Sequence, residues 1–235
     1  MRIKKLFNVK NLMIFVFITF ILSIAYVTVR IIMAPAVAPS SEITVRVKSD
    51  YVLMLIQCVF GALAMLLPGL LRRIIRLNIP SVMITVYAVF LYCGIYLGEV
   101  RNFYYDIPHW DTILHIFSGA ALGALGFSLV TLLNKSESIT FSLSPVFVAL
   151  FAFCFALSLG LVWEIYEFSV DCVLNTNMQK YALESGEVLS GQSALMDTMK
   201  DLIVDTIGAA SMSIIGFISL KYKKGWLERL QLKLS

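Results

Sequence analysis

Charged residues are scarce in this chain of 235 residues, since Asp, Glu, Lys and Arg together make up only 14% of it. A soluble globular domain carries about 25%. Hydrophobic residues make up 59% of the chain, and the mean hydropathy is +0.85. Because the apolar residues also fall in long runs, the composition excludes an ordinary soluble domain and indicates a protein that lies in a lipid bilayer.

The sequence motifs of several familiar enzyme classes are missing as well. The chain has no glycine-rich phosphate loop ending in Lys-Ser or Lys-Thr, no Gly-x-Ser-x-Gly nucleophile elbow and no His-Glu-x-x-His zinc helix. Its four cysteines show no metal-type spacing and no obvious disulfide pairing, and three of them lie inside apolar runs. Any functional site must therefore be sought among the few charged residues.

Six apolar runs are each long enough to form a membrane-spanning helix. A helix needs about 20 residues to cross roughly 30 Å of hydrocarbon. The runs lack the two-residue alternation of barrel strands, so the predicted fold is an all-α polytopic membrane bundle. The six predicted transmembrane helices cover residues 12–29, 51–71, 81–98, 112–133, 144–168 and 202–220.

The distribution of lysine and arginine predicts the orientation of these helices. With six spans, both termini lie on the same side of the membrane. The loops on that side hold thirteen basic residues and the loops on the other side hold six. Because cytoplasmic loops are richer in Lys and Arg, both termini are predicted to be cytoplasmic. The six on the outer side are Arg30, Arg46, Lys48, Arg101, Lys180 and Lys200.

The chain divides by function into three predicted parts. Residues 1–100 hold three N-terminal transmembrane helices, and residues 101–220 form a three-helix core that carries the motifs, with an outer loop at 171–200. Residues 221–235 form a basic cytoplasmic segment, which resembles an interfacial helix and would contact anionic lipids. The bilayer is the partner that the basic residues indicate, and they do not imply a nucleic acid.

Ionisable residues gather where the last three predicted helices meet the outer face of the membrane. Within each helix they are mostly three or four residues apart, which places them on one helical face. Carboxylates are costly in lipid, so these faces should point into the bundle. The residues are Asp106, His109, Asp111 and His115 of the fourth helix, Glu164, Glu167 and Asp171 of the fifth, and Asp197, Asp201 and Asp205 of the sixth.

Small residues predict how these helices pack. Gly119 and Gly123 in the fourth helix and Gly208 in the sixth allow the two backbones to approach closely, which would draw the acidic faces together. Aromatic residues nearby, including Tyr104 and Trp110, are predicted to form the outer aromatic belt of the membrane.

Carboxylates and imidazole together fit a divalent cation site. The predicted metal ligands are Asp111, His115, Glu164, Glu167, Asp201 and Asp205. Crowded carboxylates also suit general acid and base catalysis, for which Glu164, Glu167 and Asp205 are the candidates. Two alternatives stay open. The acids could form an ion or proton pathway, or a structural polar network that includes Arg101 or Lys200.

Three segments carry a family resemblance: Asp111-Thr-Ile-Leu-His115, Trp163-Glu-Ile-Tyr-Glu167, and the stretch from Asp197 to Ala209 with its three aspartates. Together they resemble the YjdF-like family of bacterial inner-membrane proteins of unknown function and, more distantly, the VanZ-like proteins associated with glycopeptide antibiotic tolerance. The resemblance implies a multi-pass protein of the bacterial cytoplasmic membrane whose matched acids and histidine are functional. It implies no substrate.

These observations favour a membrane protein with an acidic and histidine-containing site near the outer leaflet, metal-dependent and acting on a lipid or cell-envelope precursor. A small proton- or ion-coupled transporter and a non-catalytic membrane partner protein are the alternatives. The sequence leaves open the substrate, the identity of the metal, the oligomeric state and whether the protein is an enzyme.

Overall fold

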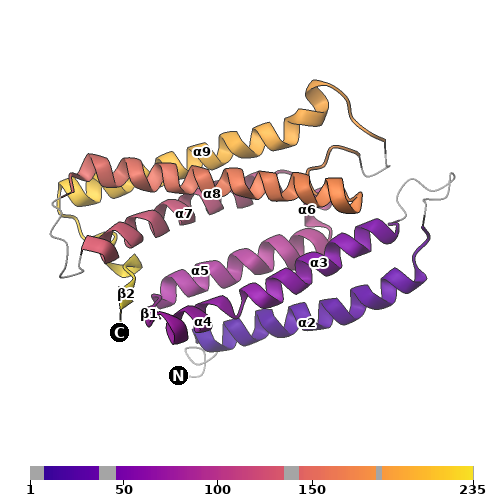
Figure 1. Ribbon diagram of the computed structural model, residues 1–235, viewed down its shortest axis with the longest axis horizontal. Coiled ribbons are helices and arrows are strands. Elements are labelled where there is room, and N and C mark those ends of the chain that lie inside the picture. Colours follow the sequence, from indigo (N-terminus) through magenta and orange to yellow (C-terminus); the bar gives the residue numbers. More distant parts are fainter. Residues whose placement is uncertain (1–7, 37–45, 135–142, 184–186, 235) are drawn as a thin grey trace. The chain divides into compact units, whose positions relative to one another are not determined.

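The computed structural model describes residues 8–36, 46–134, 143–183 and 187–234 (Figure 1). Within these residues, six helical segments are long and apolar enough to cross a membrane, which confirms the predicted all-α membrane fold. Arg2, Lys4, Lys5 and Lys135, which contribute to the predicted orientation, lie outside the described residues. The segments are α2 (Val9–Met33), α3 (Lys48–Ala64) with α4 (Leu67–Ile74), α5 (Ser81–Leu91) with η1 (Tyr92–Val100), α7 (Trp110–Asn134), α8 (Pro145–Leu174) and α9 (Gln192–Lys221).

Two of the six segments are not continuous α-helices. The second breaks between α3 and α4, where Pro68 occupies the first turn of the new helix. In the third, α5 continues directly into η1, a π-helix of nine residues. Such i→i+5 segments are rare and usually shorter. After η1, Asn102 adopts a left-handed conformation (φ 66°) and begins the short helix α6 (Phe103–Asp106).

The chain forms two compact units, and the first comprises Met1–Met65, Leu91–Asp111 and Val162–Asp201. In this unit α2 packs against α3, with Val27, Tyr51 and Met54 buried between them. Hydrophobic burial therefore fixes the N-terminal helical pair.

The second unit comprises Leu66–Phe90, Thr112–Leu161 and Leu202–Ser235. Its core consists of Phe127, Val130, Val148, Ala152 and Leu227. Gly126 brings α7 against α8, since a Cβ at this position would lie 2.8 Å from the Cα of Ala152. Small residues thus set the spacing of α7 and α8.

The C-terminal segment differs from the expected interfacial helix. After α9 ends at Lys221, Lys223 and Gly225 adopt positive φ angles, which an α-helix cannot accommodate. A single turn, η2 (Glu228–Leu230), and a two-residue strand, β2 (Lys233–Leu234), follow. The strand pairs antiparallel with β1 (Leu77–Asn78), and the buried Leu232 N–H donates to Ser128 Oγ at 2.7 Å. The prediction of a helix here was wrong because the segment pairs with the rest of its unit.

The outer loop is shorter than the predicted range of 171–200. Helix α8 continues to Leu174, and α9 begins at Gln192, directly after Gly191 with its φ of +58°. The connection therefore spans residues 175–191, of which 184–186 lie outside the described residues.

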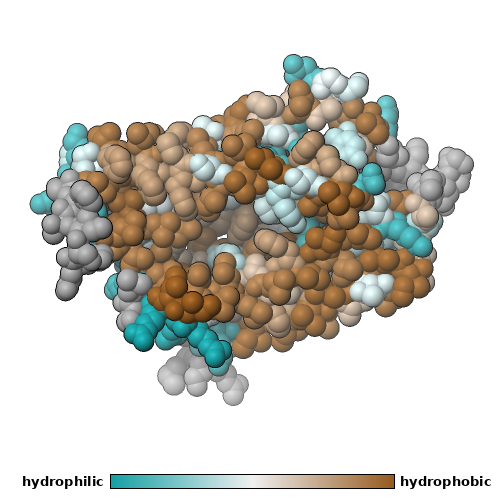
Figure 2. Space-filling model, in the orientation of Figure 1, coloured by the Kyte–Doolittle hydropathy of each residue, from teal (hydrophilic) through white to brown (hydrophobic). Residues whose placement is uncertain are grey.

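Large apolar side chains cover the outside of the helices. Ile18, Leu22 and Ile32 of α2 are 50%, 65% and 77% exposed. Figure 2 shows that hydrophobic residues dominate the surface on the face it presents. A soluble monomer rarely exposes this much apolar surface, so the surface is suited to contact with the hydrocarbon core of a bilayer.

A labelling experiment tests the predicted orientation. Cys172 is exposed in the last turn of α8, whereas Cys58 is buried and Cys93 and Cys154 lie within apolar segments. A membrane-impermeant thiol reagent applied to intact cells is expected to label Cys172 and none of the other three. A Cys172→Ser variant, which should remain unlabelled, is the control. Labelling of Cys172 only after permeabilisation would reverse the predicted orientation.

Candidate functional site

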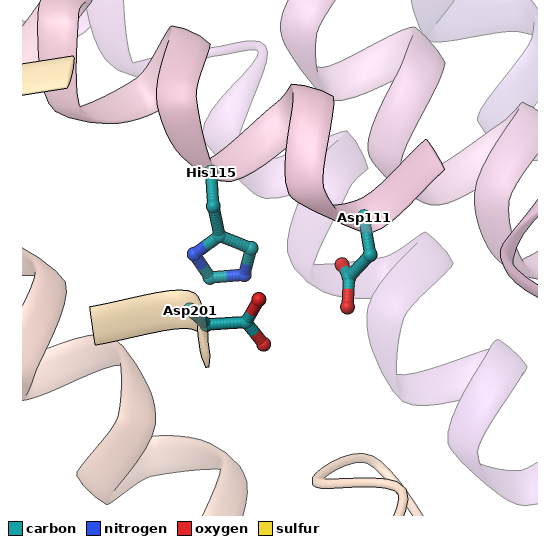
Figure 3. A group of neighbouring side chains, drawn as sticks. All are labelled: Asp111, His115 and Asp201. Carbon is teal, nitrogen blue, oxygen red and sulfur yellow. The ribbon is translucent and has the colours of Figure 1, made fainter. Parts of the chain in front are cut away.

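Three ligand-type side chains from α7 and α9 converge. Asp111 and His115 are one turn apart on α7, and Asp201 lies on α9. Each offers one ligand atom, and these atoms all lie within 4.8 Å of one another. Figure 3 shows Asp111 and His115 projecting from the same side of α7 toward Asp201. Asp201 is only 1% exposed, so its carboxylate needs compensation from its surroundings.

A carboxylate from α9 orients the histidine. His115 Nδ1 lies 3.3 Å from Asp205 Oδ2, and both residues are buried. Ser118 Oγ donates to the other oxygen of Asp205 at 3.1 Å. An ionised carboxylate only accepts hydrogen bonds, so a hydrogen bond to it requires the tautomer with the proton on Nδ1, which would direct the lone pair to Nε2. In Figure 3 the ring turns this second nitrogen toward Asp201 and Asp111.

Glycines make room for this arrangement. A Cβ at Gly119 would lie 2.5 Å from the Asp205 carbonyl oxygen, and one at Gly208 would collide with the Ile116 carbonyl. Helices α7 and α9 are therefore in backbone contact, as the small residues predict. On α8, a Cβ at Gly160 would lie 2.7 Å from Asp205 Oδ2. The contact of Gly160 with Asp205 was not predicted, because a single glycine in an apolar helix does not indicate which side chain packs against it.

Helix α8 contributes further acids on one buried face. Glu164, Glu167 and Asp171 are all buried, as the three- and four-residue spacing predicts. Glu167 interacts electrostatically with Glu164, and also with Asp111 and Asp201. The predicted acidic faces of the three helices thus meet as repelling carboxylates. The roles assigned to Glu164 and Glu167 in catalysis or metal binding stay predictions.

Among the described residues, Lys180 is the cation that forms ion pairs with this cluster, in place of Arg101 or Lys200, which the sequence suggested for a polar network. Lys180 Nζ forms an ion pair with Asp111 and lies 3.8 Å from Asp197 Oδ2. It also lies 4.8 Å from the centre of the Tyr104 ring. Burial alone would lower the pKa of Lys180, but the carboxylates of Asp111, Asp197 and Asp201 outweigh it and raise the pKa.

Asp171 explains how Lys180 reaches the acids. Its carboxylate accepts hydrogen bonds from Thr176 Oγ1 at 2.6 Å and from the backbone N–H groups of Met178 at 2.7 Å and Gln179 at 2.8 Å. Lys180 follows with a φ of 52°. The carboxylate thereby folds the start of the loop back over the end of α8. Asp171 shares the acidic face of α8, but its observed contacts are structural.

Other polar groups of the first unit surround these acids. Burial raises the pKa of Tyr104 well above its usual value, and the carboxylates of Asp111 and Glu99 add to this effect. The sequence placed Tyr104 in the aromatic belt. Glu99 accepts a hydrogen bond from Gln57 Nε2 at 3.3 Å. Gln57 and Glu99 are polar residues surrounded by apolar residues in the sequence, and this isolation was the signal that could have identified them.

Two of the ionisable residues predicted at the outer face are exposed. Asp106 accepts a hydrogen bond from Asn102 at 3.0 Å on the short helix α6. His109 has a φ of 62° in the turn before α7. Neither is part of the group of ligand atoms formed by Asp111, His115 and Asp201.

Comparison with known proteins identifies the family. The model of a family described as "Predicted membrane protein (DUF2238)" matches residues 18–222, which is most of the chain. The chain belongs to this family. The resemblance to YjdF-like proteins is consistent with the match, whereas the match gives no support to the VanZ-like resemblance.

A relative of this DUF2238 chain is described as an uncharacterized protein of Thermotoga maritima. The two are 32% identical over 120 residues, which cover 51% of this chain and 53% of the relative. The chain thus spans about half the length of the relative it matches. No solved structure matches the chain. Membership in this family shows that the chain is a membrane protein. Its chemistry has to be argued from the arrangement of its side chains.

Proposed function

We propose that this DUF2238 protein holds a divalent cation on Asp111, His115 and Asp201, and that it acts from this site on a lipid or cell-envelope precursor in the bacterial cytoplasmic membrane. The observation that carries the proposal is the convergence of two carboxylates and one imidazole, with ligand atoms within 4.8 Å. Two oxygen ligands and one nitrogen ligand suit Mn²⁺ or Zn²⁺ better than Ca²⁺, which prefers oxygen alone.

The residues around the three ligands support this function. Metal-binding histidines usually donate their second N–H group to a carboxylate, and Asp205 provides that contact to His115. Asp205 acts here as a positioning residue and not as a ligand. Glu164 and Glu167 add two further buried carboxyl groups from α8, and a divalent cation would offset the repulsion among these acids.

Three protein ligands leave coordination positions open for water or substrate. A cation in such a site polarises a bound oxygen and lowers the pKa of bound water. The protein residues would hold the ion, and Glu167 is the candidate to accept a proton beside it. The alternative functions, a transporter or a structural partner, use the same acids without a resident metal.

Melting of the purified protein in detergent tests the cation site. After EDTA treatment, added Zn²⁺ or Mn²⁺ is expected to raise the melting temperature with the logarithm of its concentration. At 100 times the Kd the stabilisation should be about 2.7 kcal/mol. Asp201→Asn keeps the size of the side chain and should abolish the response, because one of three ligands loses its charge.

Asp197→Asn is the matched control, since it removes the same charge one turn earlier on α9 from a residue outside the ligand group. It should retain most of the response. Mass spectrometry of the untreated protein should find bound metal in the wild type and less in Asp201→Asn. The proposal fails if the wild type carries no metal and neither Mg²⁺, Ca²⁺, Mn²⁺ nor Zn²⁺ stabilises it.

A further inference from the structure

A large groove lies in the first unit, among residues that the cation site does not use. Its volume is about 1,330 Å³. Small-molecule sites usually measure about 300–1,000 Å³. Helix α2 forms one side with residues three or four apart on one face, namely Phe15, Thr19, Leu22, Ser23, Tyr26 and Arg30. The opposite side includes Tyr92, Tyr96 and Val100 of η1.

The groove has one charged end and one apolar end. Arg30, Arg46 and Arg101 line it together with a single acid, Asp106. Phe15 and Tyr92 lie at the other end, with their ring centres 5.7 Å apart. At 1.5 Å per residue, the distance along α2 from Arg30 to Phe15 is about 22 Å. This length is a large part of the roughly 30 Å thickness of the hydrocarbon core.

Two of the three arginines donate hydrogen bonds to neutral partners. Arg30 donates to Tyr51 Oη from Nε at 3.0 Å and from Nη2 at 2.7 Å. Arg46 donates to the side-chain oxygen of Asn102. In the described part of the chain, Arg30, Arg46 and Arg101 form no ion pair with a carboxylate. Arg30 and Arg46 are thus held in place by these hydrogen bonds, and Arg46 also interacts electrostatically with Glu99.

The three arginines come from separate parts of the sequence and line the same groove. Only six basic residues fall on the predicted outer side, and three of them line this groove. Arg30 lies inside the α2 span, where an arginine is costly and usually marks a functional contact. Guanidinium groups bind phosphate oxygens through paired hydrogen bonds. Phe15, Leu22 and Tyr26 are exposed on a membrane-spanning helix, so the groove is open to the hydrocarbon phase.

We infer that this groove binds one membrane lipid with an anionic phosphate head group, whose phosphate contacts Arg30, Arg46 and Arg101 and whose hydrocarbon chain lies along α2 toward Phe15. The inference goes beyond the cation site and does not depend on it. The charged end supplies the selectivity for an anion, and the apolar end excludes a free phosphate ion as the main ligand.

The test uses the full-length protein in detergent with EDTA present, so that failure of the cation site does not affect it. Phosphatidylglycerol, phosphatidylcholine with the same acyl chains, and inorganic phosphate are added separately. Native mass spectrometry counts the bound lipid. The wild type is expected to bind one phosphatidylglycerol at least tenfold more tightly than phosphatidylcholine, and inorganic phosphate at equal concentration should not displace it.

Variants separate the two ends of the groove. The double variant Arg30→Gln and Arg101→Gln should weaken phosphatidylglycerol binding at least tenfold and phosphatidylcholine binding much less, because choline already balances the phosphate charge of that lipid. Thr19→Trp fills the apolar part and should weaken both lipids. Arg73→Gln, which removes an exposed charge from α4 outside the groove, is the matched control and should bind as the wild type does.

The single variant Arg101→Gln is the control for misfolding. It should fold normally, because this exposed side chain forms no hydrogen bond or ion pair within the described residues. Its melting should match the wild type while its affinity for phosphatidylglycerol falls. Equal binding of both lipids by the wild type, displacement by inorganic phosphate, or unchanged affinity in the double variant would each overturn the inference.

Discussion

Replacing Gly208 with valine is expected to lower the free energy of unfolding by about 3 kcal/mol or more, at the upper end of the cost of overpacking. A Cβ at this position would collide with the carbonyl of Ile116 and lie 3.1 Å from the backbone nitrogen of Ala120. Backbone atoms cannot rotate away as a flexible side chain can, so α7 and α9 would have to separate. Thermal melting in detergent measures the loss.

Two further glycines serve as controls for this result. Gly69 lies on α4, where an added Cβ would have no neighbouring atom within 4 Å, so Gly69→Ala should leave stability unchanged or raise it slightly. Gly123→Ala meets the Met212 side chain at 3.2 Å, which can shift, and its cost should be intermediate. If Gly208→Val melts as the wild type does, the close contact of α7 and α9 is refuted.

Replacing Lys180 with methionine should have two opposite effects. In metal-free buffer the loss of the ion pair with Asp111 leaves repelling carboxylates, and the free energy of unfolding should fall by about 2 kcal/mol. The cost is smaller than for a fully buried pair because Lys180 is 21% exposed at its side chain. A divalent cation should bind at least tenfold more tightly, because it no longer competes with the ammonium group for Asp111.

Melting with and without Zn²⁺ or Mn²⁺ measures both effects of the Lys180 substitution. Lys180→Arg retains the charge and should keep most of the stability in EDTA. Lys200→Met removes a half-buried lysine from α9, whereas the ion pair with Asp111 is made by Lys180. This control should change neither the stability in EDTA nor the affinity for the divalent cation. Equal metal affinity in wild type and Lys180→Met would show that the ammonium group and the cation do not share Asp111.

The helices and their acidic faces could be predicted from the sequence because both depend on local periodicity. Asp201 and Asp205 are four residues apart, and so are Asp111 and His115; His115, Asp201 and Asp205 are buried, and the Asp111 side chain is only 17% exposed. The cost of a carboxylate in hydrocarbon decides the direction in which such a face points. Glycine spacing predicted the contact of α7 and α9 for the same local reason.

The partner of the acids could not be predicted, because it lies in a loop whose path depends on distant contacts. Lys180 is 69 residues from Asp111, and its place follows from hydrogen bonds to Asp171. Lys200 was the more obvious candidate since it adjoins Asp201 in the sequence. Adjacent residues on a helix point in different directions, and that geometry excludes it. The pairing of β2 with β1 was missed because two-residue strands leave no periodic pattern.

The hydrogen bonds to Asp171 have a practical consequence for protein engineering. An epitope or reporter domain inserted between Thr176 and Lys180 would break a carboxylate-centred turn that three donors hold in place. Insertions are tolerated where the backbone is exposed and makes few contacts. The peptide bond after Gly191 meets that condition, because this residue is exposed and has no neighbouring atom within 4 Å of an added Cβ. A tag placed there would report the sidedness of the loop while leaving Lys180 beside its acids.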